Sequence, residues 1–509
     1  MESDNRRGGR LLFLLPYINT ALLITVLFVI VYRIGWNGKP NFIQPIMLGC
    51  IGGCVLALIV QGIVKEFTWI QAITVLIAIG LIMRIGYMLY TPIYIRYHDL
   101  GYLTIDGCGH AGYILQILRN HQLPPTNYFE CYHPPLFYFL AACVCGVIEK
   151  VVNFADNGQV LEAGKIVTCV ASCWCLLLAP KICYQLKMNQ RATAIAVAIV
   201  ALFPNCYLLA GRLNNDSLYI FFVLLAILYT IKWYQKQTWT NTMILAFAIG
   251  LGMMTKLSAG TIAFFTGPIM LIIFIKRMKE KNWLALLGKL AAFGALVFPL
   301  GLWHSIHHYI LYNQPFGYVL TISKDAEIYK GYVSPLKRFV DFTLSNLFAP
   351  LYAHPQKDYN INEYIIETSM FGEFEYRMTE SIPKVLADLI PRVLVGVNVI
   401  MVLLSLYAMY YLIVNAKKLN DILRFGIPAL WLVLYGFYIH FNIQYPFGCT
   451  MDYRYIVPTA FTGAICIGAL FDQMCNKKTT KSRIACIGIA TCTTVFCIFS
   501  ILMYCFIAE

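Results

Sequence analysis

Two aspartates and four histidines gather in one forty-residue stretch, Tyr97 to Leu136, which reads YHDLGYLTIDGCGHAGYILQILRNHQLPPTNYFECYHPPL. The stretch lies between long apolar runs, and each unpaired polar group would cost several kcal/mol in hydrocarbon. It must therefore face water, lie at a membrane boundary or line a polar cavity. Carboxylates and imidazoles in such a place can serve as general acids, general bases or phosphate contacts.

Asp99 and Asp106 are the candidate general bases of this stretch. Either carboxylate could take a proton from a substrate if its surroundings raised its basicity. The alternatives are that Asp106 caps the short helix that His110 to Asn120 can form, or that both acids are merely solvated. His98 and His110 lie beside them, and this density of titratable groups favours chemistry.

His133 stands before Pro134 and Pro135, where the chain enters the next apolar run. The prolines restrict the backbone, so the imidazole and the neighbouring Tyr132 are held in place. A fixed histidine at a boundary between water and lipid suits a phosphate contact, an acid or a base. A hydrogen bond that holds the turn is the structural alternative.

Two more charged residues stand at or within later apolar runs. Arg212 opens the sequence RLNNDS, for which the simpler interpretation is a polar turn with Asp216 capping the next helix. Lys256 interrupts AIGLGMMTKLSAGTIAFF. An ionisable side chain at mid-helix costs about 2.5 kcal/mol or more, so we expect pairing or function unless the ammonium reaches the interface.

Arg454 lies in MDYRYIVP, at the start of another apolar run. Arginine can bind phosphate through two parallel hydrogen bonds, and Tyr453 could flank a sugar or an isoprenoid. The alternative is an aromatic belt at the membrane interface with an ion pair between Asp452 and Arg454.

The composition determines which kind of protein must position these side chains. Of 509 residues, 59% are hydrophobic and 13% are charged, against roughly 25% charged in soluble domains. The apolar runs are long and continuous, so we predict an all-α polytopic membrane protein and exclude a transmembrane barrel. The formal net charge of +14 comes from basic residues in short loops, which favours a positive-inside arrangement over a nucleic-acid partner.

The eighteen cysteines predict neither a disulfide framework nor a zinc site. Many lie inside apolar runs, where they act as small apolar residues, and no CxxC pair stands in a loop with metal-site spacing. We therefore predict no metal site, and nothing in the sequence supports a divalent metal or another cofactor.

Fourteen apolar segments are candidate membrane spans by length. They lie near 11–33, 42–64, 68–96, 135–152, 164–186, 191–210, 216–235, 241–256, 259–275, 284–307, 389–415, 422–442, 452–474 and 482–506. Two full crossings between 135 and 186 would put Lys187 and Arg191 on the wrong side of the membrane. We therefore expect thirteen true crossings, with one of those two segments re-entrant or interfacial.

The predicted orientation places all the polar segments on one face. With the N-terminus inside, the loop 97–136 and the segments 308–388 and 448–454 lie on the non-cytoplasmic side. The chain then divides into an N-terminal transmembrane module (1–307), an external segment or small subdomain (308–388) and C-terminal transmembrane helices (389–509).

The motifs HDLG, GHAGYI, YHPPL, NNDSL, TKLSAG and DYRYIVP resemble those of the membrane glycosyltransferases of the GT-C class. They are similar in particular to the dolichyl-phosphate-mannose protein mannosyltransferase-like group, glycosyltransferase family 39, and its bacterial members. The likeness is strongest over 97–140 and weak across 308–388. It implies a GT-C-like helical bundle whose first external loop is catalytic.

The resemblance also implies roles for the candidate residues. Family members carry the acceptor-activating acid in the first external loop, which corresponds to Asp99 or Asp106. This chain departs from the adjacent Asp-Glu pair of many relatives, so the choice between the two stays open. The position of His133 corresponds to a cation or histidine near the lipid phosphate. The substrate-binding candidates are His98, His110, Tyr132, His133, Arg212, Lys256, Tyr453 and Arg454.

The function implied is inverting transfer of a sugar from a polyprenyl-phosphate carrier to a glycan, lipid or protein acceptor. The reaction would take place at the outer face of the cytoplasmic membrane. The alternatives are a transporter or flippase of lipid-linked glycans, and a polysaccharide polymerase or ligase. A transporter should carry its ionisable residues at mid-membrane and show repeat symmetry. Here those residues gather on one face, which favours the enzyme.

Overall fold

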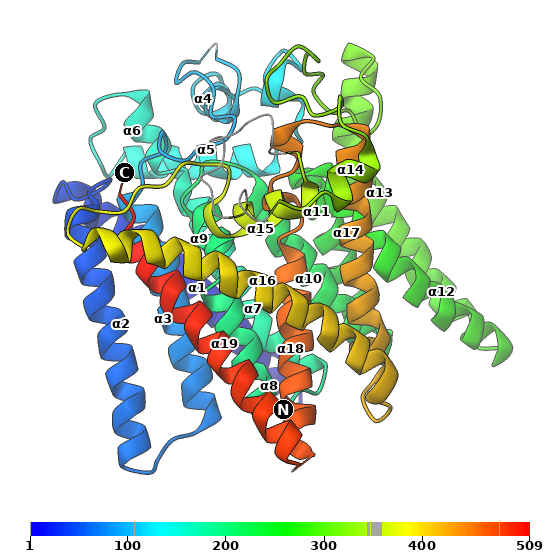
Figure 1. Cartoon of the computed structure of the whole chain (residues 1–509). Coiled ribbons are helices and arrows are strands. Elements are labelled where there is room, and N and C mark those ends of the chain that lie inside the picture. Colours follow the sequence, from blue (N-terminus) through cyan, green and yellow to red (C-terminus); the bar gives the residue numbers. More distant parts are fainter. Residues whose placement is uncertain (1, 106, 344–346, 348–358, 478, 509) are drawn as a thin grey trace.

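The structure is a computed structural model that describes residues 2–105, 107–343, 347, 359–477 and 479–508, with side chains from residue 14 onward (Figure 1). Helices and loops make up the described part of the chain, with two isolated bridges in place of any strand there. The predicted all-α class is therefore confirmed. Asp106 lies outside the described residues, so the structure does not bear on its predicted role.

The helices of the N-terminal half are α1 (Glu2–Arg33), α2 (Pro40–Ile63), α3 (Trp69–Tyr90), α4 (His110–Asn120), η1 (Phe129–Tyr132), α5 (Leu136–Glu149), α6 (Asn157–Glu162), α7 (Lys165–Gln185), α8 (Gln190–Ala201), α9 (Pro204–Ala210), α10 (Asp216–Gln235), α11 (Trp239–Thr255), η2 (Leu257–Ile262), α12 (Ala263–Lys279) and α13 (Leu284–Tyr312). Those that follow are α14 (Pro335–Val340), α15 (Ile361–Phe371), α16 (Lys384–Asn415), η4 (Ile422–Gly426), α17 (Ile427–Gln444), η5 (Gly448–Thr450), η6 (Tyr453–Tyr455), α18 (Pro458–Asn476) and α19 (Thr480–Cys505).

All fourteen predicted apolar segments contain helices. Within the described residues, ten helices are long and apolar enough to cross a membrane, or up to twelve if each of two bent pairs counts as one span. The bent pairs are α8 with α9, at 51°, and η5–η6 with α18, at 47°. The two remaining segments form the shorter apolar helices α5 and α11.

The two short helices α11 and α5 differ in where they lie in the bundle. α11 packs along α10 and returns the chain to the end where α10 began, because Lys256 after α11 contacts Asp216 at the start of α10. α5 has 14 residues, about 21 Å of helix, and lies with α4 and α6 at one end of the bundle (Figure 1). Length and composition give ten to twelve candidate spans among the described residues, and the thirteen crossings stay a prediction.

The polar segments gather at that same end of the bundle (Figure 1). The amide of Lys330 donates to the carbonyl of Pro446, and that of Gly448 donates to Ile328. The amide of Ala508 donates to Arg377. These bonds tie the segment after α13 to the loop before α18 and to the end of α19. The connection after α16, where the sequence has Lys417 and Lys418, lies at the opposite end.

A buried arginine supports the break between α8 and α9. Pro204 starts α9 and cannot continue the hydrogen bonding of α8, which leaves carbonyls of the last turn of α8 without helical partners. Arg84 of α3 donates to two of them, the oxygens of Val200 at 3.0 Å and Ala201 at 2.7 Å. This cation is therefore structural, and the bend that it stabilises turns the chain toward the site.

Candidate active site

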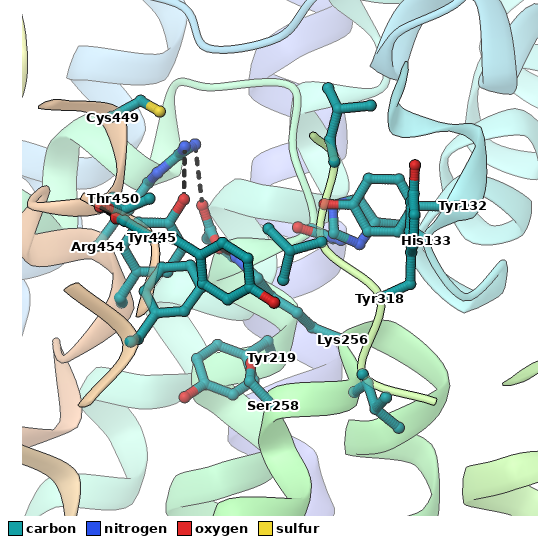
Figure 2. A pocket seen from close by; sticks show the side chains of 18 of the residues that line it. Tyr132, His133, Tyr219, Lys256, Ser258, Tyr318, Tyr445, Cys449, Thr450 and Arg454 are labelled. Carbon is teal, nitrogen blue, oxygen red and sulfur yellow. Dashed lines mark hydrogen bonds and ion pairs between the residues drawn. The ribbon is translucent and has the colours of Figure 1, made fainter. Parts of the chain in front are cut away.

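A cavity of about 520 Å³ opens at the polar end of the bundle (Figure 2). Its walls come from the loop 97–136, the starts of α10 and η2, α13, α17 and the stretch around η6. Six sequence-predicted residues line it: Asp99, His110, Tyr132, His133, Lys256 and Arg454. His98, Arg212 and Tyr453 do not. The fold thus brings the larger part of the predicted set to one place.

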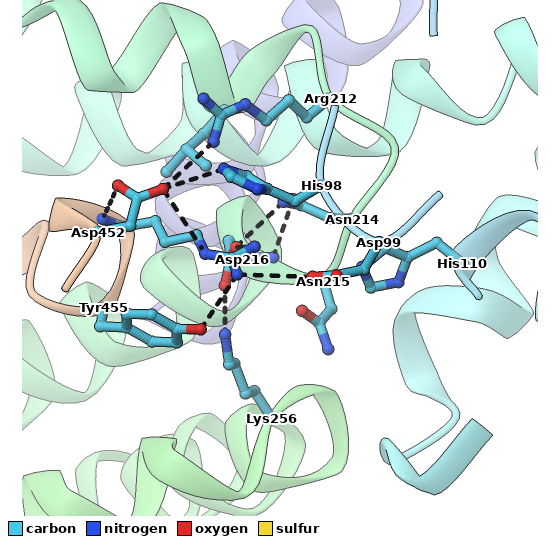
Figure 3. Close-up of polar contacts among 12 residues, drawn as sticks. His98, Asp99, His110, Arg212, Asn214, Asn215, Asp216, Lys256, Asp452 and Tyr455 are labelled. Atoms are coloured by element: carbon cyan, nitrogen blue, oxygen red, sulfur yellow. Dashed lines mark hydrogen bonds and ion pairs between the residues drawn. The ribbon is translucent and has the colours of Figure 1, made fainter. Parts of the chain in front are cut away.

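Arg454 contacts three carboxylates, those of Asp99, Asp216 and Asp452, and Figure 3 shows these three acids. Its Nη2 is 3.5 Å from Asp99 Oδ2, its Nη1 is 3.8 Å from Asp216 Oδ2 and its Nε is 3.7 Å from Asp452 Oδ2. Nη2 also donates to the hydroxyl of Tyr455 at 3.1 Å. The arginine is 5% exposed, so its charge is held by protein groups rather than by solvent.

Lys256 pairs with Asp216, and this corrects the simpler interpretation of the RLNNDS turn. The ammonium lies 2.6 Å from Asp216 Oδ1 and 4.8 Å from the ring centre of Tyr455. The side chain of Asp216 does not cap α10. It accepts from Lys256 and Asn214 and faces Arg454. The predicted pairing of Lys256 is confirmed, while the predicted capping role of Asp216 is wrong.

The backbone of the GHAG turn presents Asp99 to the cavity. The amides of His110 and Ala111 donate to the carbonyls of Asp99 and Leu100, and so close the loop against the start of α4. Gly109 adopts a φ of +102°, and a Cβ there would lie 2.6 Å from the oxygen of Leu100. Only glycine fits this close approach. Asp99 itself has a φ of +52°, an uncommon conformation for a residue other than glycine.

A second polar group lies close to Asp99 in the cavity lining. His133 Nε2 lies 2.8 Å from Glu130 Oε2, and His110 Nε2 lies 3.9 Å from the same oxygen. Burial opposes ionisation of Glu130, but the neighbouring His133, His110 and Arg454 outweigh it and lower its pKa. Burial lowers the pKa of His110. Sequence reasoning missed Glu130, although it stands three residues before the predicted His133.

His98 lies behind Arg454 and outside the cavity lining. Its Nε2 is 3.1 Å from Asp452 Oδ2, and its Nδ1 is 3.5 Å from Glu373 Oε2. Burial, with Arg454 and Arg212 nearby, lowers the pKa of His98 to about 4. Burial and the adjacent Asp452 raise the pKa of Glu373 to about 8. A neutral His98 therefore stands between a carboxylate and a protonated glutamate.

Arg212 also belongs to this layer behind the cavity. It is 3% exposed, stacks on Phe374 at 4.6 Å and lies 3.9 Å from Asp452 Oδ2. None of its three guanidinium nitrogens has a hydrogen-bond partner among the described residues. Its position supports the charge of Asp452 and does not reach a substrate in the cavity.

Tyr455 faces the cavity, in place of the predicted Tyr453. Tyr453 is buried, and its hydroxyl is 3.0 Å from Thr459 Oγ1. Tyr455 lines the cavity beside Lys256 and Arg454. The sequence offered both tyrosines on either side of Arg454, and the short helix η6 decides which one turns inward.

His304, on α13, also lines the cavity. It is 2% exposed, and its Nε2 has no hydrogen-bond partner among the described residues. Its ring lies 4.1 Å from that of His308, which faces Gln314. The sequence analysis did not assign these histidines to the site.

One cavity is therefore lined by an acid, two cations and aromatic side chains. Residues 132–303 match the family model of dolichyl-phosphate-mannose-protein mannosyltransferases. The match covers about a third of the chain, confirms the resemblance and supports a membrane glycosyltransferase of the GT-C type. It includes His133, Arg212 and Lys256 but neither Asp99 nor Arg454. No curated protein matches the sequence.

Proposed function

We propose that the protein is an inverting glycosyltransferase that uses a polyprenyl-phosphate sugar as its donor. The observation that carries the proposal is that a carboxylate, Asp99, and two cations, Lys256 and Arg454, line one cavity. The cavity lies at the polar end of a multi-pass helical bundle, where the headgroup of a membrane-bound donor must lie. The family match over 132–303 supports the reaction class.

The chemical step requires one base and one stabilised leaving group. An acceptor hydroxyl or amine attacks the anomeric carbon, and the bond between that carbon and the phosphate oxygen breaks. The electron pair leaves with the polyprenyl phosphate, and attack from the opposite face inverts the anomeric centre. Asp99 takes the proton of the acceptor. No nucleotide is needed, because the donor already carries its leaving group.

The cations suit the leaving phosphate. Among the residues that the structure describes, the ammonium of Lys256 makes one hydrogen bond, to Asp216, so two of its three donors can bind a ligand. Arg454 presents a guanidinium whose geometry matches phosphate. The interaction of both cations with the phosphate strengthens in the transition state, because negative charge grows on the phosphate as the sugar departs. In the view of Figure 2, Lys256 lies between Arg454 and His133. We place the phosphate against these three residues.

Aromatic side chains supply the remaining walls. Tyr132, Tyr219, Tyr318 and Tyr455 all line the cavity, and Figure 2 shows the first three. Tyrosine rings can pack on the apolar faces of a sugar or on the first isoprene unit while their hydroxyls form hydrogen bonds. A cavity of about 520 Å³ is large enough for a sugar with its phosphate.

The orientation belongs to the same proposal. Basic residues in the connections opposite the cavity favour that side as cytoplasmic. The active site would then lie on the outer face of the cytoplasmic membrane, where a glycan, lipid or protein acceptor meets the donor.

The test is transfer by the purified protein from a panel of polyprenyl-phosphate sugars to unfractionated envelope acceptors. We expect release of polyprenyl phosphate with one donor, and product of inverted anomeric configuration by NMR. Movement of lipid-linked sugars across proteoliposome membranes without release of polyprenyl phosphate would support the transporter instead. Turnover only with diphosphate-linked oligosaccharides would support the polymerase or ligase.

A further inference from the structure

Three side chains of the first external loop form a pocket of metal-binding donors. One oxygen each from Asp99 and Glu130 and one ring nitrogen of His110 lie within 4.8 Å of one another. All three residues line the cavity. We propose that Asp99, His110 and Glu130 bind a divalent cation of the Zn²⁺ or Mn²⁺ kind.

The spacing suits such an ion. Ligand atoms about 2.1 Å from a metal lie roughly 3 to 4.2 Å from one another in tetrahedral or octahedral geometry. The donor atoms of this group lie within 4.8 Å of one another, so a tetrahedral site, with ligand atoms about 3.4 Å apart, requires side-chain rotations that close gaps of up to about 1.4 Å. A mixed set of one imidazole and two carboxylates is typical for Zn²⁺ and Mn²⁺, whereas Ca²⁺ and Mg²⁺ prefer oxygen alone.

Outer hydrogen bonds already orient two of the three ligands. His110 Nδ1 lies 2.8 Å from the hydroxyl of Tyr138, and with its proton on Nδ1 the imidazole offers a lone pair on Nε2. His133 Nε2 lies 2.8 Å from Oε2 of Glu130 and holds that carboxylate. Metal-binding histidines and carboxylates are held in this way by groups that do not touch the ion.

The described residues contain a second group of metal-binding donors, but its surroundings suit a cation less well. His98, Glu373 and Asp452 also lie close enough to hold an ion. Two guanidiniums oppose a cation there, since Asp452 Oδ2 is 3.9 Å from Arg212 and 3.7 Å from Arg454. This group also stands outside the cavity lining. The group around Glu130 has one guanidinium nearby, that of Arg454 at Asp99, and its free side opens into the cavity.

The consequence for catalysis rests on the proposed sugar transfer. Three protein ligands leave positions on the ion that a substrate oxygen can occupy, as in catalytic metal sites. An acceptor hydroxyl bound there would lie beside Asp99. Coordination lowers the pKa of a bound hydroxyl, so its proton would pass more readily to the free oxygen of that carboxylate.

Direct binding to the full-length protein tests the site without any substrate. Purified protein is stripped with a chelator and titrated with ZnCl₂ and with MnCl₂ by calorimetry. We expect one ion per chain, and at least tenfold weaker binding in His110→Ala and Glu130→Gln. Tyr138→Phe should weaken binding about tenfold through the orientation of His110, without removing a ligand.

Two control variants separate this site from others. His304→Ala removes a histidine of the same cavity, and Glu373→Gln alters the second donor group; both should bind as the wild type does. Thermal unfolding identifies variants that have lost their fold. No saturable binding by the wild type, or unchanged affinity in both His110→Ala and Tyr138→Phe, would overturn the proposal. If the protein binds the metal but transfers sugar from no donor, the metal site stands and the proposed function is overturned. If it transfers sugar but binds no metal, the proposed function stands and the metal site is overturned.

Discussion

Arg454 Nη2 lies 3.5 Å from Asp99 Oδ2, although Asp99 stands in the loop 97–136 and Arg454 more than three hundred residues later. The contact places the proposed base next to a group that we assign to the leaving phosphate. At this separation, the base can activate the acceptor while the cation binds the leaving phosphate of the same sugar.

Asp99→Asn should abolish transfer and leave the fold intact. The amide cannot accept the acceptor proton, and general-base catalysis contributes about 10²- to 10⁴-fold. The side chain of Asp99 is 37% exposed, so the change should cost little stability, within about 0.5 kcal/mol. Turnover and thermal unfolding of the purified variant check both expectations. Asp106→Asn is the companion variant, and full turnover in both would mean that neither acid is the base.

Arg454→Lys should impair transfer although it keeps the charge. An ammonium cannot form two parallel hydrogen bonds to phosphate. Losing a charged hydrogen bond of about 1.5 to 3 kcal/mol corresponds to a loss in kcat/KM of roughly ten- to a hundredfold. The loss should appear in the KM for the donor, or in kcat if the contact tightens as the sugar departs. An unchanged kcat/KM would place the phosphate elsewhere.

Lys256→Met should destabilise the protein, and a second change should restore stability without restoring transfer. The single variant leaves the buried Asp216 without its closest cation, and breaking a buried pair costs about 3 to 5 kcal/mol. Asp216→Asn in the same chain removes the stranded charge. Thermal unfolding and turnover of both variants decide the matter. Transfer at the wild-type rate in the double variant would exclude Lys256 as a phosphate contact.

Glu373 should make stability fall as pH rises. Its pKa is raised from 4.5 to about 8 by burial and by Asp452, with Tyr364, Arg454 and Arg212 acting against the rise. Between these two values the folded state keeps a proton that the unfolded state has lost, so stability declines with pH.

Glu373→Gln removes this titration, and the comparison isolates it. As pH rises from 4.5 to about 8, the unfolding temperature of the wild type should fall relative to that of the variant. His98 lies against Glu373 and has its pKa lowered to about 4, so it acts in the opposite sense below its ordinary pKa of 6.5. Parallel unfolding curves for the two proteins across the window would show that Glu373 is ionised throughout.

The polar end of the bundle should face away from the cytoplasm. Tyr128 is 66% exposed in the loop 97–136, and Tyr184 is 80% exposed at the far end of α7. In a background cleared of native cysteines, Tyr128→Cys should react with a membrane-impermeant maleimide added outside intact cells. Tyr184→Cys should react only after lysis. The reverse pattern would invert the orientation and remove the outer-face assignment.

Much of the site could be predicted because its residues violate the surrounding pattern. Lys256 and Arg454 interrupt or begin apolar runs, and the acids and histidines of the loop 97–136 stand out against hydrocarbon. Such residues are costly unless they are paired or used. The fold class followed from composition in the same way, since apolar runs of this length have one stable form in a bilayer.

What could not be predicted depends on contacts between distant segments. Asp216 looks like a capping residue until the return of α11 brings Lys256 to it. The inward turn of Tyr455 rather than Tyr453 depends on one short helix, η6. Glu373 gave no signal, because nothing local distinguishes it from the other acids of its segment. Its contact with His98 joins two segments of the chain that lie far apart in the sequence.

The hairpin of α10 and α11 implies an order of assembly during synthesis. Asp216 and Lys256 stand at the two ends of one hairpin, so the growing chain can neutralise both charges before the C-terminal half exists. Asp99 is made earlier still, yet it meets Arg454 only after α17 has entered the membrane. The nascent protein therefore carries a charge-paired hairpin well before the residues of the proposed active site can meet.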